Sequence, residues 1–503
     1  MDETDLLVVG GGINGVGIAR EAAGRGLSVV LVEKDDLAAH TSSASSKLVH
    51  GGLRYLEQFD FKLVRESLAE RERLLRSAPH IVEPLQFVLP LTESAPSAWK
   101  VRAGLMLYDR LASRRILPPS RAVHLGGIFG QGLRPGPSDG FTYWDCKVQD
   151  SRLVVLTAMS AAERSAKIIT RTELVSARRE GARWIATCTG PLGTRTIGVR
   201  AIVNAAGPWA GALFDWLSGF TSRPNVRLVR GSHIVLPRLF AGDHAFILPG
   251  PDRRVVFAIP FEGEFTLVGT TDVECAVPLD PPTIDDEEIG YLLAVVERTF
   301  DASPSRSDIR WSYSGIRALA DDGSSDPSQV TREYRLDLDA PQGRAPLLSV
   351  IGGKITTYRR LAERALDRLE AFFPRRRGRR PDEPLPGGDI PRLDVKAYLR
   401  ELTTLRYPAM PPELLVRLVH TYGTRAPSIL KVAKSMDDLG EHFGAGLTRR
   451  EVDYLVKHEW AQTAEDVLFR RTKLGLHVTQ ESADHLTSYL EGVLTCRSSG
   501  GPG

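Results

Sequence analysis

The sequence predicts an α/β protein that also contains an antiparallel sheet and a helical C-terminal region. Residues 5–33 run as a short apolar segment, a glycine-rich turn, a helical segment and a second apolar segment. This is the order of a βαβ unit with buried parallel strands. Residues 226–273 consist of three strand-like segments, VRLVRGSHIVLP, RRVVFAIPF and FTLVGTTDV, which favour an antiparallel sheet. After about residue 390 the pattern is mainly helical.

Composition excludes several classes of protein. The chain has 503 residues, of which 42% are hydrophobic and 25% charged, as in ordinary globular proteins of two or three domains. The net charge of +3 does not favour a nucleic-acid partner. The start, MDETDLLVVG, is acidic and does not resemble a signal peptide. No run of about 18 apolar residues predicts a membrane-spanning helix, although attachment to a membrane surface stays possible.

The turn of the first unit carries a dinucleotide-binding spacing. Gly10, Gly12 and Gly15 form G-x-G-x-x-G between the first strand and the helix. These glycines allow a tight turn, close approach of the backbone to a pyrophosphate, and close packing of helix on strand. Glu33 ends the second strand, where a carboxylate accepts hydrogen bonds from ribose hydroxyls and repels a 2′-phosphate. The motif predicts a bound dinucleotide, without separating FAD from NAD.

The following segments are expected in order. Residues 60–78 predict a charged helix, and residues 99–117 a basic amphipathic helix. Strand and helix alternate again from about 140 to 215. The arginine-rich segment PRRRGRRPDEPLPGGDIPR is interpreted as a linker or exposed loop, because proline, glycine and charge are dense there. The four cysteines lie far apart and lack a CxxC pair, which favours reduced thiols over disulfides or a zinc site.

The stretch SSASSKLVHGGLRYL, Ser42 to Leu56, combines small residues with polar groups. Small residues let a backbone approach a ligand closely, and the polar groups indicate a charged ligand. Taken alone, the stretch is better explained as a serine-rich loop that caps a helix and leaves Arg54 on the surface.

Several long motifs together resemble the FAD-dependent glycerol-3-phosphate dehydrogenases, specifically the bacterial aerobic type. They are VGGGINGVGIAREAAGRG, TSSASSKLVHGGLRYLE, VNAAGPWA, RGSHIVLP, VGTTDVE, SYSGIRAL, GGKITTYRRLAERAL and HEWAQTAEDVLFRRTKLG. The resemblance implies an FAD domain of D-amino-acid-oxidase type interleaved with an antiparallel substrate-binding sheet, followed by a helical cap. The expected ranges are 1–90, 150–215 and 310–375 for the FAD domain, 91–149 and 216–309 for the substrate domain, 376–390 for a linker, and 391–503 for the helical domain.

The resemblance also implies FAD as cofactor and oxidation of sn-glycerol 3-phosphate to dihydroxyacetone phosphate by hydride transfer to flavin N5. It places the stretch from Ser42 along the cofactor, with Gly51 and Gly52 beside the flavin ring. A glycine turn at Gly353 opens a helix whose positive end would stabilise the reduced ring. The residues expected to bind the cofactor are Gly10, Gly12, Asn14, Gly15, Glu33, Ser42, Ser43, Ser46, Lys47, Leu48, Gly52, Gly207, Gly353 and Thr356.

The substrate phosphate requires cations or several hydrogen-bond donors. Arg54 and Lys354 are expected to hold it, with Tyr55 adding a hydroxyl and Thr270 bonding a substrate oxygen. His233 is the candidate base because imidazole titrates near the working pH. On its strand pattern alone, however, His233 is better explained as a hydrogen-bonded structural residue, and it is the resemblance that makes it the candidate base. Arg317 keeps its proton and is expected to orient the hydroxyl and stabilise negative charge.

The resemblance further implies a membrane quinone as electron acceptor and a peripheral enzyme on the cytoplasmic face of the cell membrane, with a homodimer possible. The segment Trp99–Leu117 mixes basic, aromatic and aliphatic residues, as interfacial helices do. A helix buried against the protein's own core explains the same pattern. Three functional alternatives stay open: an oxidase that uses O2, another FAD-dependent oxidoreductase of this fold, and a flavin-binding protein without catalysis.

Overall fold

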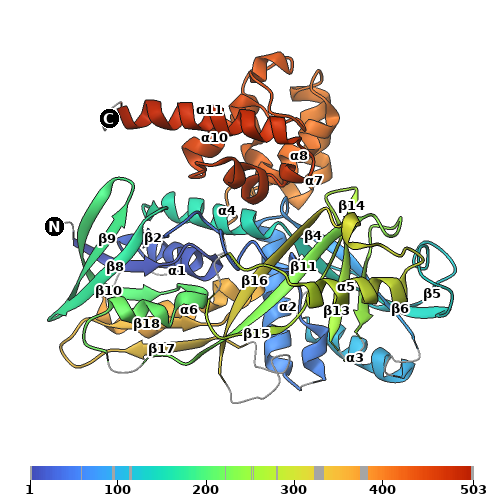
Figure 1. Ribbon diagram of the computed structural model, residues 1–503, viewed down its shortest axis with the longest axis horizontal. Helices are drawn as coiled ribbons and strands as arrows, with labels where there is room; N and C mark the ends of the chain where they lie inside the picture. Colours follow the sequence, from blue (N-terminus) through green and yellow to red (C-terminus); the bar gives the residue numbers. More distant parts are fainter. Residues whose placement is uncertain are drawn as a thin grey trace.

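The computed structural model describes residues 3–57, 59–92, 97–112, 116–220, 223–250, 252, 254–278, 281–321, 333–373 and 383–499. The protein has two sheets side by side below a helical C-terminal domain (Figure 1). The arginine cluster of residues 375–380 lies outside the described residues. The expected fold class, with an FAD-type α/β unit, an antiparallel sheet and a helical cap, is confirmed.

The first sheet is built around the predicted βαβ unit. Within the described residues it has eight strands, with β17-β18-β10-β1-β2-β7 as its main path and the β8–β9 hairpin attached to β10. The central pairs are parallel. Its strands are β1 (Glu3–Val9), β2 (Val29–Val32), β7 (Lys167–Ile169), β8 (Glu173–Glu180), β9 (Arg183–Gly190), β10 (Gly193–Asn204), β17 (Arg335–Asp339) and β18 (Leu347–Ile351).

The second sheet is almost wholly antiparallel, because it is built from hairpins rather than from helical crossovers. Its described strands follow the order β15-β11-β14-β13-β12-β4-β6-β3, with β16 on β11 and β5 on β6. They are β3 (Leu48–Val49), β4 (Val82–Pro90), β5 (Arg121–His124), β6 (Asp139–Val148), β11 (Val226–Pro237), β12 (Ala245–Pro249), β13 (Val255–Phe261), β14 (Phe265–Gly269), β15 (Val273–Cys275) and β16 (Trp311–Ala320).

Three strands lie in a different sheet from the one suggested by the expected ranges. Strands β3 and β4 fall in the range 1–90 and β16 in the range 310–375, yet all three belong to the second sheet. Strand β16 pairs with β11 from Val226↔Ala320 to Val235↔Trp311. Such a long antiparallel ladder fixes its place, whereas its sequence shows only that it is a strand.

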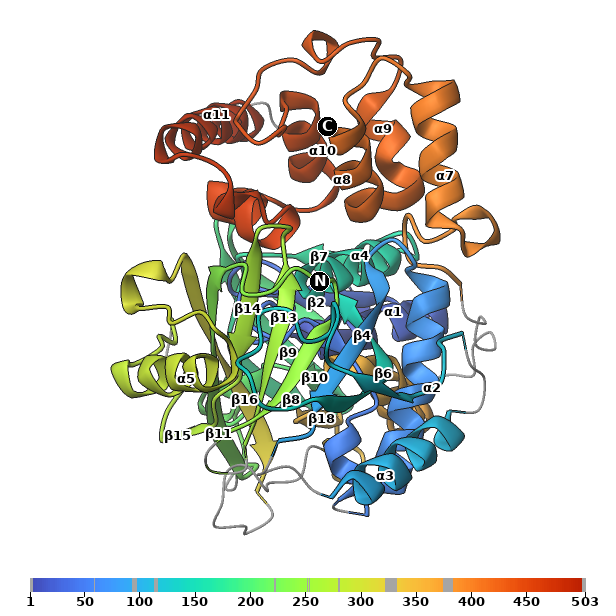
Figure 2. The same cartoon turned by 90° about the vertical axis from the view of Figure 1, so that its right-hand side faces the viewer.

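Helices pack against both sheets. They are α1 (Ile13–Gly24), α2 (Phe61–Ser77), α3 (Ala98–Leu111), α4 (Asp150–Ala162), α5 (Asp286–Thr299) and α6 (Tyr358–Leu369). The C-terminal domain contains α7 (Val395–Glu401), α8 (Pro412–Tyr422), α9 (Ala426–Leu430), α10 (Arg449–His458) and α11 (Gln480–Ser499), with a π-helical turn, η11, at Asp466–Arg471. Figure 2 shows this domain on the opposite side of the molecule from α3.

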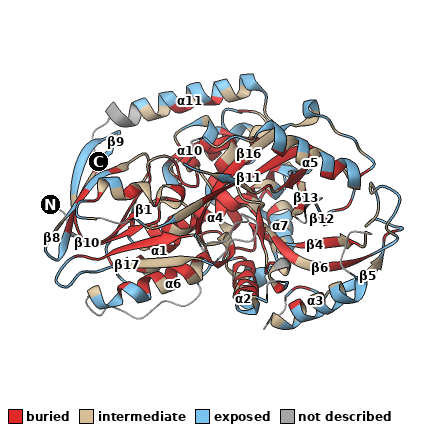
Figure 3. Ribbon diagram, turned by 60° about the horizontal axis from the view of Figure 1, so that its bottom comes forward, coloured by how far each residue is buried: buried red, intermediate tan, exposed pale blue. Residues whose placement is uncertain are grey.

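Helix α4 lies between the first sheet's helices and the C-terminal domain. Its residues Asp150 to Ala161 are all buried, and Figure 3 shows the buried residues concentrated in this central layer. Its carboxylate at Asp150 and its guanidinium at Arg152 are therefore in a dry environment, where each requires a partner. These two side chains connect the candidate site to the C-terminal domain.

Candidate active site

The turn between β1 and α1 has the backbone conformation that the glycine spacing predicts. Gly10 has φ of 114°, and a Cβ atom there would lie 2.4 Å from the carbonyl oxygen of Ala205. A Cβ on Gly15 would lie 1.9 Å from the carbonyl oxygen of Gly10. Gly12 is the N-cap of α1. Only glycines fit this turn, which presents the N-terminus of α1 to a ligand.

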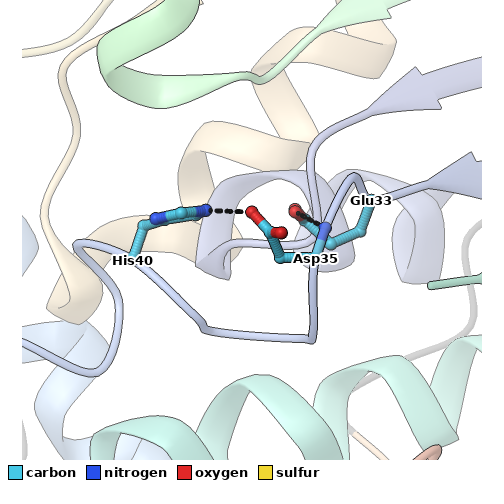
Figure 4. A group of neighbouring side chains, drawn as sticks. All are labelled: Glu33, Asp35 and His40. Carbon is cyan, nitrogen blue, oxygen red and sulfur yellow. Dashed lines mark hydrogen bonds and ion pairs between the residues drawn. The ribbon is translucent and has the colours of Figure 1, made fainter. Parts of the chain in front are cut away.

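Glu33 closes the turn from the end of β2 (Figure 4). Its Oε2 accepts a hydrogen bond of 2.5 Å from the Gly11 N–H, and its Oε1 accepts one of 2.9 Å from the Asp35 N–H. Burial raises the pKa of the Glu33 carboxyl, and the Asp35 and Gly11 N–H groups partly offset that rise. Nε2 of His40 lies 2.8 Å from Asp35. The carboxylate therefore lies beside the glycine turn, as the motif predicts.

The stretch that follows crosses from the first sheet to the second. The Ser42 hydroxyl accepts a 3.0 Å hydrogen bond from the Ile13 N–H at the start of α1. The Thr41 hydroxyl donates to the Ile316 carbonyl on β16 at 2.6 Å. Ser46 Oγ lies 2.9 Å from Nε2 of His233 on β11. This stretch thus joins the dinucleotide turn to the candidate base.

Lys47 is held by protein groups. Its Nζ lies 2.9 Å from Oδ2 of Asp150 and donates at 2.9 Å to the carbonyl of Ser43. Both charged groups are buried. The Ser43 hydroxyl donates to the His40 carbonyl, and Leu48 begins strand β3. A direct contact of Lys47 with the cofactor stays a prediction, and the ion pair with Asp150 gives this lysine a structural role that the sequence did not indicate.

Three candidate substrate residues meet on the second sheet. His233 on β11 pairs with Gly269 on β14, and Thr270 follows directly. A Cβ atom on Gly231 would lie 2.5 Å from a terminal nitrogen of Arg317 and 2.7 Å from the Thr270 hydroxyl. The guanidinium and the hydroxyl therefore converge over one glycine, where the absence of a side chain leaves them room.

Arg317 is held in place by the loop after β14. One of its terminal nitrogens lies 2.7 Å from Oδ1 of Asp272 and donates at 2.9 Å to the Thr271 carbonyl. A guanidinium has five donors in a rigid fork, so a carboxylate contact on one edge orients the rest.

His233 is a neutral imidazole. Burial, followed by the charges of Lys47 and Arg317, lowers its pKa to about 3. The ring stacks on Tyr313 with centroids 4.9 Å apart. Its Nδ1 is buried, and no group among the described residues hydrogen-bonds to it. The imidazole is therefore unprotonated at neutral pH, as a general base must be, but its pKa lies well below the working pH near which the sequence predicted it to titrate.

A second group forms where the stretch meets the helix start at residues 353–358. The Lys354 ammonium lies 3.6 Å from the centroid of the Tyr55 ring, the geometry of a cation–π contact. The Asn14 side-chain amide donates at 3.0 Å to the Gly352 carbonyl. A Cβ atom on Gly353 would lie 2.9 Å from the Asn14 amide nitrogen. The turn expected beside the flavin therefore touches the start of α1.

The remaining expected residues are placed as follows. Gly52 has φ of 78° and faces the Tyr55 ring. Thr356 is buried, and Gly207 begins the short η2 turn, Gly207–Trp209, with φ of 55°. The Arg54 side chain lies outside the described residues, so its contact with a phosphate stays a prediction.

Two family models match the chain and together span most of it. Residues 5–359 match the FAD dependent oxidoreductase family, and residues 381–494 match the C-terminal domain of alpha-glycerophosphate oxidase. A glycerol-3-phosphate dehydrogenase of Pseudomonas aeruginosa is 51% identical, covering 97% of this chain and 95% of its own. The chain belongs to the FAD-dependent glycerol-3-phosphate dehydrogenase family.

Another relative and a solved structure are also similar to the chain over most of its length. A D-erythritol 1-phosphate dehydrogenase of Brucella abortus is 49% identical, covering 95% of each chain. The crystal structure of the Bacillus halodurans glycerol-3-phosphate dehydrogenase with FAD has a TM-score of 0.75 and 25% identity, and covers 97% of this chain and 89% of that one. The protein is an FAD-dependent enzyme.

The residues present fit the cofactor that this dehydrogenase family uses. Gly10 and Gly15 let the turn pack tightly against the protein's own backbone, where a Cβ atom would clash, and the N-terminal N–H groups of α1 lie at this turn, as in a phosphate-binding site. The Oδ1 atom of Asn14 is buried, with no hydrogen-bond partner among the described residues. FAD would lie along Gly10–Asn14 and Ser42–Gly52, and when bound it would supply the hydride acceptor.

Sequence reasoning missed a buried network beneath the glycines at positions 51 and 52. The Tyr108 hydroxyl on α3 donates to Asp145 at 2.7 Å and accepts a 2.8 Å hydrogen bond from the Gly51 N–H. Arg71 on α2 pairs with the same carboxylate at 2.7 Å. No local pattern in the sequence pairs Tyr108 with Gly51, which lies 57 residues earlier in the chain. His50 also lies in this region, where burial and the nearby Lys354 charge lower its pKa.

Proposed function

We propose that the protein oxidises sn-glycerol 3-phosphate to dihydroxyacetone phosphate and passes the electrons to a membrane quinone. The observation that carries this proposal is the neutral, buried His233 beside the oriented guanidinium of Arg317. An alcohol oxidation needs a group that takes the hydroxyl proton while the hydride leaves from carbon. A protein that only binds flavin does not need this pair.

Each residue is given one role in the reaction. His233 accepts the hydroxyl proton, and Arg317 with Thr270 holds the hydroxyl oxygen and stabilises its developing negative charge. Lys354, Arg54 and Tyr55 bind the phosphate. The ammonium of Lys354 over the Tyr55 ring supports this assignment, because the contact fixes a point charge on an otherwise flexible side chain.

Anaerobic mixing with substrate tests the proposal. Glycerol 3-phosphate should bleach the flavin absorbance, and glycerol should not. Bleaching by both compounds would refute the phosphate site, and bleaching by neither would refute the reaction.

A second substrate is favoured by the relative that is 49% identical and named for D-erythritol 1-phosphate. Both compounds are phosphate monoesters of polyols, and the same cationic groups serve either one. The ratio of kcat/KM for the two substrates separates them, and a ratio above 10 for glycerol 3-phosphate would support the main assignment, since one hydroxylated carbon is worth about 10- to 200-fold in a fitted pocket.

An oxidase reaction is the second alternative, favoured by the match of residues 381–494 to a domain named for alpha-glycerophosphate oxidase. Electrons would then reduce O2 to hydrogen peroxide. Peroxide yield compared with reduction of a quinone analogue under air distinguishes the reactions. Stoichiometric peroxide in the presence of the quinone would overturn the assignment of a quinone acceptor.

The surface of α3 supports attachment to a membrane. The helix buries Leu105 and Tyr108 against the protein. Trp99 is 69% exposed and Met106 46% exposed. Exposed aromatic and aliphatic side chains among basic residues suit the headgroup region of a bilayer. Among the described residues, no helix is long and apolar enough to span a membrane.

Vesicle binding tests this surface. Trp99→Ala with Met106→Ala should release the enzyme from phosphatidylglycerol vesicles, and Arg110→Glu should do so at low salt. Leu405, which is 77% exposed in the C-terminal domain, provides the control Leu405→Ala. Unchanged binding of the α3 variants would show that another surface meets the lipid.

A further inference from the structure

The C-terminal domain is joined to the loop after β2 by a buried group of ion pairs. Both Asp36 oxygens bind Arg471, at 2.5 Å and 2.8 Å, and Nε of Arg470 lies 2.7 Å from the same carboxylate. Asp36 is 2% exposed and Arg471 1% exposed. A bidentate arginine–carboxylate contact fixes direction as well as distance, so these pairs hold the loop in one position.

The same loop carries Glu33, the expected ribose ligand. The Thr172 N–H donates to the Glu33 carbonyl at 2.7 Å, and the Arg171 N–H donates to the Asp35 carbonyl at 2.8 Å. The Arg171 side chain then binds Asp466 of the C-terminal domain at 2.7 Å. The loop is therefore held by this domain directly, through Asp36, and indirectly, through Arg171.

The two arginines of this contact are themselves held by other residues. Arg471 donates to the Glu459 carbonyl through two of its nitrogens, at 3.2 Å and 2.6 Å. The Glu459 carboxylate is bound bidentately by Arg152 of the buried helix α4. Arg470 also binds Asp466, and burial alone would raise the pKa of that carboxyl, but the charges of Arg171, Arg471 and Arg470 hold it far below its usual range. The Asp466 carboxylate therefore stays ionised at every working pH.

This segment of the C-terminal domain also touches the second sheet. The Phe469 ring lies 5.4 Å from the ring of Trp311 on β16, and Trp311 lies 4.8 Å from Tyr313, which stacks on His233. Lys473 is buried beyond it and lies 6.0 Å from the Trp311 ring centroid. One segment, residues 459–473, therefore contacts both the dinucleotide loop and the sheet that carries the candidate base.

We propose that residues 459–473 act as a clamp that retains FAD, in which Arg470 and Arg471 are positioning residues for the Glu33 loop. Without the clamp, Asp36 is an unpaired buried carboxylate, and the loop must move to solvate it. That movement displaces Glu33 from the glycine turn and lowers affinity for FAD. This inference rests on the proposed place of Glu33 at the ribose of the cofactor.

The experiment compares FAD affinity in full-length variants. Arg471→Gln and Asp36→Asn are each expected to weaken FAD binding at least tenfold, and the double variant to lose less than the product of the two, because it removes both charges. Arg471→Lys keeps the charge without the bidentate contact and should fall between. The dissociation constant is measured by flavin fluorescence on refolded apoprotein, and the unfolding midpoint of each apoprotein by circular dichroism.

A matched control lies in the same domain. Arg417 binds the buried Glu451 carboxylate at 2.6 Å and 2.7 Å, a pair of the same kind that lies within the C-terminal domain. Arg417→Gln should lower the unfolding midpoint and leave FAD affinity within twofold. An equal loss of FAD affinity in Arg417→Gln and Arg471→Gln would mean that both substitutions act through the overall stability of the protein. That result would overturn the proposal.

Two further results distinguish failure of the clamp from failure of the assignment of Glu33 to the ribose. Glu33→Ala should weaken FAD binding in every background. If Glu33→Ala binds FAD like the wild type, the ribose assignment fails and the clamp with it. If Glu33→Ala is impaired and Arg471→Gln binds normally, only the clamp is refuted.

Discussion

Ser46 Oγ lies 2.9 Å from Nε2 of His233, and this hydrogen bond links the stretch proposed to bind the cofactor to the second sheet. The serine belongs to the crossing segment and the histidine to β11. A shift of either sheet relative to the other would change this distance. The hydrogen bond therefore orients the candidate base relative to the cofactor, and its loss should affect proton transfer before it affects folding.

Replacement of His233 should slow flavin reduction and leave cofactor binding intact. His233→Gln keeps a hydrogen-bonding side chain but removes the base, and a positioned base contributes about 10²- to 10⁴-fold. Ser46→Ala should cost less, about tenfold, because the imidazole stays but is no longer oriented. Single-turnover flavin bleaching under anaerobic conditions measures both. A His233→Gln variant within threefold of wild type would remove His233 from the reaction.

The low pKa of His233 makes a second prediction, for the dependence of the rate on pH. Burial, with Lys47 and Arg317, lowers that pKa to about 3, so the imidazole is unprotonated throughout pH 5–8. The rate of flavin reduction at saturating substrate should therefore change little between pH 7 and pH 5. An acid limb centred near 6.5 would mean that the functional base is another group or that substrate raises the pKa of His233.

Removal of the Lys354 charge should weaken binding of the phosphate. Lys354→Met is expected to raise the apparent dissociation constant of glycerol 3-phosphate about 10- to 100-fold, the value of a hydrogen bond to a charged group. Stopped-flow titration of flavin bleaching measures it. Lys62→Met, on the exposed side of α2, controls for net charge. An equal effect of the two substitutions would show that Lys354 acts only through the general field of the protein.

Tyr108 should matter for the segment beside the flavin although it lies on α3. Tyr108→Phe removes the acceptor that lies 2.8 Å from the Gly51 N–H and the donor to Asp145. The expected loss is about 1–3 kcal/mol of unfolding free energy, the cost of unpaired buried polar groups. Urea denaturation of the holoenzyme measures it. Tyr143→Phe, in a neighbouring buried tyrosine, should cost less, and the reverse order would contradict this account of the network.

His80 should make the protein less stable in acid. Burial, then Arg152 and His420, lowers its pKa from 6.5 to about 3, so the unfolded chain binds a proton that the folded chain excludes. This penalty is absent above pH 6.5 and grows as the pH falls toward 3. At pH 5 it amounts to about 2 kcal/mol. His80→Leu should therefore lose less stability than wild type between pH 7.5 and 5 in chemical denaturation. His124→Gln, which changes an exposed histidine, should lose as much stability as wild type over this pH range.

Local patterns predicted the parts of the fold that local physics determines. The βαβ unit was predictable because Gly10 and Gly15 have no alternative at their positions, and the strands around His233 because they are rich in valine, isoleucine, phenylalanine and threonine. The sheet to which β16 belongs depends on its pairing with β11, which lies about 80 residues away and leaves no local signal. Lys47 shows the same limit, because its partner Asp150 is distant in sequence.

Strands of the two sheets alternate along the chain, from β2 to β3, from β6 to β7, and from β16 to β17. No single cut therefore releases an intact half, and the second sheet cannot be exchanged as a cassette. New specificity in such an architecture must arise by point changes in the walls of the site. Ancestral reconstruction within this lineage should accordingly find specificity changes in scattered side chains rather than in recombined blocks.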